Sequence, residues 1–256
     1  MLYSAVSGEQ NQSTVPVVLL HGLFGSSDNL AVIRRHLEKD YRVISIDLPD
    51  HGNSPHFTEF SFDAWAQEVI TCIQQHTDQA VNIVAHSLGG KVAMATASMQ
   101  ASMVNKLVIL DIAPVNYPPR HENVMKALNS VDLGQLNSRQ AAMQSMLNHV
   151  SDRNVIAFLL KSLVNIDGQW RWRFNLPLIQ REYERVSDWP YSGKLFSGPT
   201  YFIKGKQSDY IIAEHQDIIM QQFPQAQAKI VDAGHWLHAE KPHLVNSLLT
   251  RLLPDN

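Results

Sequence analysis

The chain has 256 residues, of which 45% are hydrophobic and 18% charged, and its formal net charge is −3. This length supports one large core, and these fractions are those of an ordinary globular protein. The small negative charge, without a cluster of lysine and arginine, argues against a nucleic-acid partner.

Targeting and redox signals favour a protein of the cytoplasm. The first ten residues, MLYSAVSGEQ, show neither the basic start nor the apolar run of a signal peptide. No segment reaches the roughly 18 apolar residues of a membrane span. Cys72 is the single cysteine, which excludes an internal disulfide and suits a reducing compartment. We expect it to be a small buried residue of an amphipathic helix.

Short apolar, β-branched runs alternate along the chain with segments of helical spacing. The strand-like runs are PVVLLHG, YRVISID, VNIVAHS, KLVILDI, PTYFIKG and AKIVDAG. The clearest helical segments between them are NLAVIRRHLEKD and SFDAWAQEVITCIQQH. Continuous apolar strands, each followed by a helix, indicate a parallel sheet covered on both faces. The sequence therefore predicts an α/β fold with a mostly parallel sheet flanked by helices.

The first strand-like run ends in the pattern His-Gly-x-x-Gly, within PVVLLHGLFGSSDNL. Such a loop leaves room for a backbone N–H to face a developing oxyanion. A plain strand-to-helix turn would explain Gly22 and Gly25, but not their position before the serine segment described next.

That segment, VNIVAHSLGGKVAM, places Ser87 between a strand and a helix. This is the pattern of a nucleophile elbow, in which a strained turn lifts the serine hydroxyl above the sheet. The residues two before and two after the serine must be small, and they are Ala85, where glycine is commonest, and Gly89. Gly90 allows close helix packing. The helix that begins at Leu88 directs free N–H groups toward the serine oxygen.

A long connection interrupts the alternation between KLVILDI and PTYFIKG. It contains the helical stretch RQAAMQSMLNHVSDRNVIAFLLKSLV and the cluster DGQWRWRFNLP. A connection of this length in a compact domain is usually functional and often a lid. We interpret residues 114–194 as a helical cap inserted before the penultimate strand. Residues 1–113 and 195–256 then form the core of a single structural domain.

The cap contains the candidate residues for substrate choice. The candidates for an apolar acyl pocket are Phe158, Trp170, Trp172 and Phe174. The candidates for contact with a charged leaving group, such as that of an acyl-CoA, are Lys161, Arg171 and Arg173. The alternative is that the tryptophans only pack the cap onto the core.

The segment AKIVDAGHWLHAEKP places His235 directly after the last strand. Serine, aspartate and histidine follow one another along the chain in this order, which is also the order found in one known type of catalytic triad. We predict that His235 is the general base, which takes the Ser87 proton and returns it to the leaving group. His238 is the competing candidate, but its position beside Glu240 suits a residue that braces the loop.

The segments HGLFGS, DLPDHGNS, HSLGGK, DIAPV and GHWLHAEKP together resemble the α/β-hydrolase superfamily, and more closely its small bacterial esterases of the YbfF type. The resemblance covers nearly the whole chain. It implies a serine esterase or acyl-thioesterase with a helical cap and no cofactor. It also implies that Ser87, Asp111 and His235 form the triad. Leu23 and Leu88 would then supply the two backbone donors of the oxyanion hole.

The acid of the triad has two candidates. In most of the superfamily it follows the strand after the cap in a pattern like G-x-x-D, but here that strand ends GKQSDYI. Counting from Gly205 puts Ser208 in the usual place and Asp209 one place beyond. Asp111 ends the strand before the cap, and we favour it. Its alternative role is to cap the turn that follows.

The predicted function is hydrolysis of a small-molecule ester or acyl-CoA thioester through an acyl-enzyme, with short to medium acyl chains. The histidine and carboxylate spacings form no convincing metal-ligand set. Three alternatives remain open, namely a perhydrolase or a carbon-carbon bond hydrolase with the same triad, and a ligand-binding receptor with slow turnover. No sequence feature indicates an oligomeric state.

Overall fold

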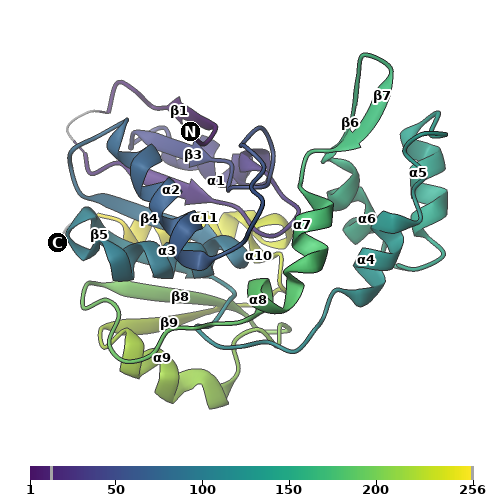
Figure 1. Cartoon of the computed structure of the whole chain (residues 1–256). Coiled ribbons are helices and arrows are strands. Elements are labelled where there is room, and N and C mark those ends of the chain that lie inside the picture. The colour runs from purple at the N-terminus through teal and green to yellow at the C-terminus, as the bar shows by residue number, and fades with distance from the viewer. Residues whose placement is uncertain (12–13, 255–256) are drawn as a thin grey trace.

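The computed structural model describes residues 1–11 and 14–254 and is built around a seven-stranded sheet in the order β1-β3-β2-β4-β5-β8-β9 (Figure 1). Within this sheet, β3, β2, β4, β5, β8 and β9 each run parallel to their neighbours. The edge strand β1 is antiparallel to β3. The strands are β1 (Ser4–Ser7), β2 (Val17–Leu20), β3 (Val43–Ile46), β4 (Val81–His86), β5 (Val104–Leu110), β8 (Thr200–Gly205) and β9 (Ala226–Val231). The predicted mostly parallel α/β sheet is confirmed, and each of the six predicted runs overlaps one strand.

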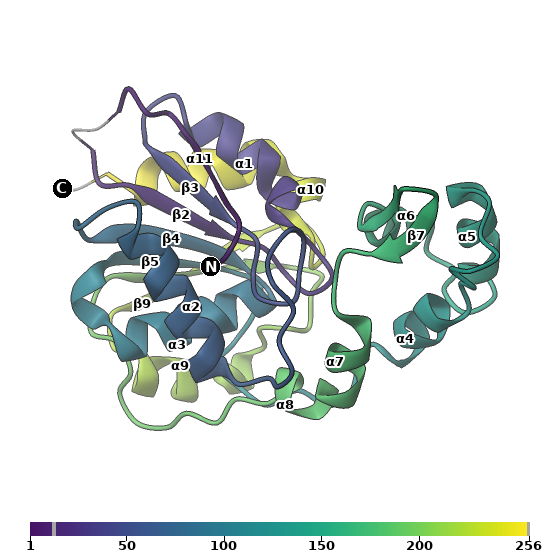
Figure 2. The same cartoon turned by 45° about the horizontal axis from the view of Figure 1, so that its top comes forward.

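Helices cover both faces of the sheet, as Figure 2 shows. One face packs on α2 (Phe62–Gln74), α3 (Leu88–Met99) and α9 (Gln216–Gln222), and the other on α1 (Ala31–Leu37), α10 (Leu237–Glu240) and α11 (Pro242–Leu252). Three short 3₁₀ helices lie at Ser27–Leu30, Ala101–Met103 and Ala213–His215. Successive strand residues alternate between the faces, so Val18 and Leu20 join one hydrophobic cluster while Val17 and Leu19 join the other. Cys72 is buried on α2, as predicted.

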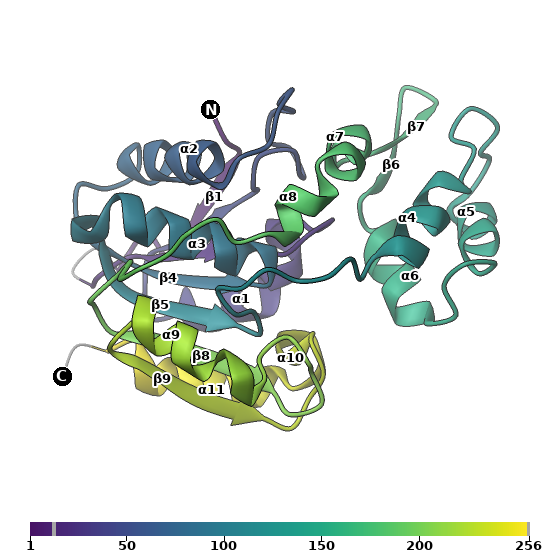
Figure 3. The same cartoon turned by 60° about the horizontal axis from the view of Figure 1, so that its bottom comes forward.

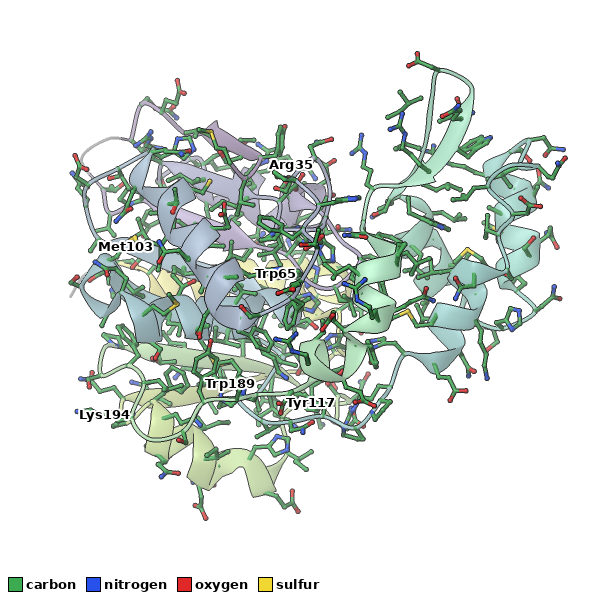
Figure 4. All side chains as sticks on the ribbon, viewed as in Figure 1. Arg35, Trp65, Met103, Tyr117, Trp189 and Lys194 are labelled. Carbon is green, nitrogen blue, oxygen red and sulfur yellow. The ribbon has the colours of Figure 1, made fainter. Side chains whose placement is uncertain are left out.

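The predicted helical insertion lies between β5 and the penultimate strand β8, and it projects to one side of the sheet (Figure 3). Its helices are α4 (Glu122–Asn129), α5 (Arg139–Met146), α6 (Arg153–Leu160), α7 (Leu176–Arg181) and α8 (Tyr183–Ser187). A hydrophobic cluster of its own runs from Ala127 to Ile179 and is joined by Phe24 from the core. The ends of the insertion pack differently, because Tyr117 and Trp189, labelled near α8 in Figure 4, belong to the main core cluster. The division into a core and a cap of residues 114–194 stays a prediction.

The insertion also contains a two-stranded antiparallel sheet that the sequence interpretation did not include. It consists of β6 (Leu163–Ile166) and β7 (Gln169–Trp172). Asp167 and Gly168 join the strands with φ values of 53° and 82°. Two successive positive φ values define a type I′ turn, for which Asp-Gly is a strong signal. The Asp-Gly pair before QWRW could therefore have identified this hairpin from the sequence.

No helix in residues 1–11 and 14–254 combines the length and the apolar character that a membrane span needs.

Candidate active site

Ser87 occupies a strained turn between β4 and α3. Its φ of 52° and ψ of −124° lie outside the usual regions for a residue with a side chain. A Cβ on Gly89 would approach the backbone oxygen of His21 to 2.3 Å, and one on Gly90 would approach the Cγ2 of Ile112 to 2.5 Å. Both distances are shorter than van der Waals contact. The glycines after Ser87 are therefore required by the close packing of this turn against neighbouring backbone and side chains.

The Ser87 hydroxyl lies at one end of a continuous hydrogen-bonded series. Its Oγ is 3.0 Å from Nε2 of His235, and Nδ1 of the same imidazole is 2.7 Å from Oδ2 of Asp111. These three residues come from the ends of β4, β5 and β9, which meet at the same edge of the parallel sheet. Such an arrangement can move a proton from the hydroxyl to the imidazole and stabilise the imidazolium that results.

The Asp111 side chain is fully buried and its oxygens are well supplied with donors. Oδ1 accepts a hydrogen bond of 2.8 Å from the backbone N–H of Gly205, and Oδ2 accepts another from the hydroxyl of Ser208. Asp111 has a φ of 54°. These bonds compensate for the loss of water around a buried carboxylate and fix the oxygen that faces His235.

Asp209, the alternative acid, lies elsewhere. Its side chain is 75% exposed and pairs with Arg120 at 2.6 Å. Ser208, which occupies the place where many relatives carry the acid, instead donates to Asp111. The geometry thus brings Asp111, and not Asp209, to the imidazole of His235.

The predicted oxyanion-hole residues both border Ser87. Leu23 and Leu88 line one cavity with it. Leu88 is the first residue of α3, so its N–H has no acceptor within the helix. Leu23 lies in the turn closed by the 3.1 Å hydrogen bond from the N–H of Gly25 to the oxygen of Gly22.

Two buried histidines hydrogen-bond to the turn that contains Leu23. Nε2 of His51 accepts the backbone N–H of Phe24 at 3.0 Å, and its Nδ1 lies 2.9 Å from the oxygen of Pro49. His21 bonds the oxygen of Gly22 through Nδ1 and accepts the N–H of Leu48 through Nε2. One acceptor and one donor on each ring describe a neutral imidazole. Burial lowers the pKa of His51 to about 3 and also lowers that of His21.

His86 and His238 support His235 from the side of the sheet. Nε2 of His86 lies 3.0 Å from the backbone oxygen of His235, and the His86 and His238 rings pack with centroids 4.4 Å apart. Burial lowers the pKa of His238 to about 3. The Ser87 hydroxyl bonds to His235 and not to His238, and the bracing role of His238 stays a prediction.

These buried neutral histidines predict that acid destabilises the protein. Burial lowers the pKa of His51, His238 and His121 to between about 3 and about 4, whereas a histidine of the unfolded chain titrates near 6.5. The unfolded chain therefore binds more protons below about pH 6.5, and the free energy of unfolding falls as the pH is lowered. Each such histidine can contribute up to about 1.4 kcal/mol per pH unit. Denaturant unfolding measured between about pH 7 and about pH 4.5 checks this slope.

A matched pair of variants tests the origin of that slope. His238→Met removes one buried titrating group, and its Nδ1 has no hydrogen-bond partner within the described chain, so we expect a shallower pH dependence. His243→Met, at an exposed position of α11, should leave the slope unchanged. A stability that does not vary between about pH 7 and about pH 5 would contradict the prediction.

Two cavities meet at Ser87. The first is mainly apolar and is lined by residues that include Leu88, Lys91 and Tyr117. The second lies between the core and the insertion and is lined by residues that include His235 and Phe158. The site therefore has room for a group on each side of the serine.

The cap aromatics divide between two roles. Phe158 lines the second cavity and packs on Trp236 with ring centroids 5.5 Å apart. Trp172 and Phe174 are 7% and 2% exposed, stack at 5.3 Å and belong to the hydrophobic cluster of the insertion. Trp170 packs against the same cluster. None of these three residues lines either cavity at Ser87, so their positions favour the alternative that they pack within the cap.

The basic cap residues also lie away from Ser87. Lys161 borders a separate surface hollow, and Arg171 is exposed on β7. Arg173 is likewise absent from the lining of both cavities at Ser87. The expectation that these residues contact a leaving group is not supported by their positions.

Sequence analysis missed several residues that surround the site. The Tyr210 ring stacks on His235 with centroids 4.0 Å apart, and Arg120 lies over the Tyr210 ring. Lys91 is 2% exposed, and its Nζ donates to the backbone oxygens of Ser187 and Asp188 at 2.7 and 2.8 Å. Burial lowers the pKa of this lysine to about 7. Lys91 lies four residues after Ser87, so helical spacing could have placed it on the serine face of α3.

Within the described residues, no group of three or more histidine, cysteine, aspartate or glutamate side chains is arranged to hold a metal ion.

Comparison with known proteins identifies the family of the chain. The alpha/beta hydrolase fold family matches residues 15–242. The chain is 38% identical to "Esterase YbfF" of Escherichia coli K12 over 98% of both chains, and 32% identical to the mouse "sn-1-specific diacylglycerol lipase ABHD11" over 98% of this chain and 84% of that protein. A solved structure described as a marine microorganism esterase superposes with a TM-score of 0.93 at 30% identity and covers 98% of this chain and 99% of that one.

Proposed function

The chain belongs to the α/β-hydrolase family and is a hydrolase of the esterase and lipase type, and from this premise we propose that it cleaves carboxylic esters or acyl thioesters by nucleophilic attack of Ser87. The observation that carries the proposal is the series Ser87, His235 and Asp111 with separations of 3.0 and 2.7 Å. The sequence analysis had favoured the same three residues. The short distances between their side chains would let a proton pass from Ser87 to His235.

In the proposed mechanism, Ser87 Oγ attacks the carbonyl carbon while Nε2 of His235 takes the hydroxyl proton. The backbone N–H groups of Leu23 and Leu88 stabilise the negative charge on the carbonyl oxygen. The imidazolium then gives its proton to the leaving oxygen or sulfur, which departs and leaves an acyl-enzyme. Water deprotonated by His235 attacks this ester and releases the acid and free Ser87. The Asp111 carboxylate orients the imidazole and stabilises its charged form throughout.

The cavities suggest how a substrate lies. The leaving atom must receive a proton from His235, which lines only the second of the two cavities. We therefore assign the leaving group to the second cavity and the acyl chain to the first. The mainly apolar lining of the first cavity suits an acyl chain, and we propose chains of short to medium length.

The proposal is tested by labelling and by a substrate screen. A fluorophosphonate probe should label the wild-type protein and not the Ser87→Ala variant. The screen covers p-nitrophenyl esters of increasing chain length and a matched set of acyl-CoA thioesters, and it separates esterase from thioesterase activity. We expect ester hydrolysis with a preference for short to medium chains. Failure of the probe to react at Ser87, together with absence of hydrolysis, would refute the proposal and favour a ligand-binding receptor.

The assignment of cap residues predicts that Phe158→Ala changes the choice of substrate. Phe158 lines the proposed leaving-group cavity, so its loss should alter the ratio of kcat/KM between esters of long and short alcohols, because such a residue acts on binding and positioning. Michaelis–Menten measurements on alkyl butanoates of increasing alcohol length check this expectation.

Trp172→Ala is the matched variant in the cap interior. Trp172 contacts Phe174 inside the hydrophobic cluster, so its truncation should lower the free energy of unfolding by about 3–5 kcal/mol. We expect little change in the ratio between long and short alcohols. The same change of that ratio in both variants would contradict the division of roles.

A cytoplasmic location, a small-molecule ester or acyl-CoA as substrate, and the absence of a nucleic-acid partner belong to this proposal. The net charge of −3 and the single cysteine support them.

A further inference from the structure

His121 lies where the two cavities meet. It directly precedes α4, the first helix of the insertion, and lines both cavities together with Leu23 and Ser87. Its ring stands edge-on to Phe24, with centroids 6.5 Å apart. A substrate that fills both cavities must therefore pass this imidazole.

The hydrogen bonds around His121 define which nitrogen carries the proton. Its Nδ1 is 2.5 Å from the hydroxyl oxygen of Tyr183, and the same oxygen accepts the backbone N–H of Arg120 at 3.3 Å. A tyrosine hydroxyl has one hydrogen to donate, and here Nδ1 is the acceptor within reach. Burial lowers the pKa of His121 to about 4, so the ring is neutral near neutral pH. The proton of the neutral ring is then on Nε2.

On the cap side, the second cavity offers a leaving group no other polar side chain among the described residues. The remaining cap residues in its lining are apolar, namely Val124, Val155, Phe158 and Leu159. On the core side, Ser87 and His235 are committed to the reacting atoms in the proposed mechanism. Oδ1 of Asn29 accepts the backbone N–H of Ser26, and Nε2 of His86 bonds the backbone oxygen of His235. Trp236 and His238 also belong to this lining. His121 is thus the cap residue of this lining that can donate a side-chain hydrogen bond.

We propose that Nε2–H of His121 donates a hydrogen bond to a second oxygen of the leaving group, close to the scissile ester. The preferred substrates are then esters of alcohols that carry an ether or hydroxyl oxygen on the carbon next to the one esterified. Esters of plain alkanols are disfavoured because they leave a buried N–H without an acceptor. This inference rests on the proposed function, and it makes His121 a determinant of specificity.

An isosteric pair of esters tests the inference. 2-Methoxyethyl butanoate and butyl butanoate share the acyl group and the length of the alcohol, and they differ by one oxygen in place of a methylene. The quantity measured is the ratio of their kcat/KM values. The intrinsic difference between the two leaving groups cancels when this ratio is compared between protein variants.

His121→Phe keeps the ring and removes the donor, so the ratio should fall by about tenfold relative to the wild type, as expected for loss of one buried hydrogen bond to substrate. His121→Gln retains an N–H near the position of Nε2 and should restore much of the preference. Tyr183→Phe frees Nδ1 and permits the other tautomer, so it should lower the ratio by a smaller factor. His149→Phe, at an exposed cap position outside both linings, is the control and should keep the wild-type ratio.

The outcomes separate this inference from the proposed function. A fall of the ratio in His121→Phe with recovery in His121→Gln supports a hydrogen bond to the leaving group. An unchanged ratio, or equal losses on both esters, overturns the inference while hydrolysis that depends on Ser87 upholds the proposed function. Absence of Ser87-dependent hydrolysis of both esters overturns the proposed function and this inference with it. If His121→Phe does not fold, Tyr183→Phe provides the same comparison, because it removes the hydroxyl that bonds Nδ1 of His121.

Discussion

Ser87→Ala should lower ester hydrolysis by about 10⁴-fold or more and leave a folded protein. The hydroxyl is the only group placed to attack a carbonyl beside the Leu23 and Leu88 amides in the proposed mechanism, and loss of a triad nucleophile typically costs several orders of magnitude. Alanine and serine are similarly strained at a φ of 52°, so the turn should keep its shape. The check is kcat/KM on one short-chain p-nitrophenyl ester.

The control for this variant is Ser145→Ala, in α5 and outside both cavities, which should retain wild-type activity. Thermal unfolding of both variants within a few degrees of the wild type would show that the folds are intact. A folded Ser87→Ala protein with most of its activity would mean that another group is the nucleophile.

The sheet was predictable because its strands are buried on both faces. Val81 and the residues that follow it are covered by helices on each side, so they form continuous apolar runs that sequence alone can recognise. The edge strand β1 was missed because it is only half-buried and pairs through one side. A strand of this kind needs few apolar residues and leaves little pattern.

The candidate site was predictable where the backbone requires special residues. Gly89 and Gly90 are constrained by close contacts, and such constraints give motifs that can be read without coordinates. The cap was less predictable. Trp172 and Phe158 are both aromatic residues of the insertion, yet one packs in the cap interior and the other lines a cavity. The difference depends on how the hairpin and α6 pack in the folded insertion, and local sequence does not encode that packing.

His121 and Arg120 show a further limit. They approach the site from the segment that leads into α4 and meet Tyr183 and Tyr210 from distant parts of the chain. No spacing rule links these residues, because their contact results from the path of the insertion over the sheet. Such residues become visible only when the chain is folded.

Asp111→Asn should lower kcat by about 10⁴-fold, whereas Asp209→Asn should keep activity to within about tenfold. Asparagine at position 111 would present an amide N–H to Nδ1 of His235 and so favour the wrong tautomer for accepting the Ser87 proton. Asp209 is 75% exposed and pairs with Arg120, and an exposed ion pair contributes little to stability. Both variants are measured on one short-chain ester after each is shown to unfold cooperatively.

The two substitutions make the same chemical change at positions that the sequence could not separate decisively. Asp111 accepts bonds from Gly205 and Ser208 as well as from His235, so its amide also loses part of this support and some stability with it. A pH profile separates the effects: a tautomer defect persists at every pH where the protein is folded, whereas loss of fold follows the unfolding transition. If Asp209→Asn were the variant that lost activity, Asp209 would have to reach His235 in the working enzyme. The Arg120 pair would then have to open during turnover.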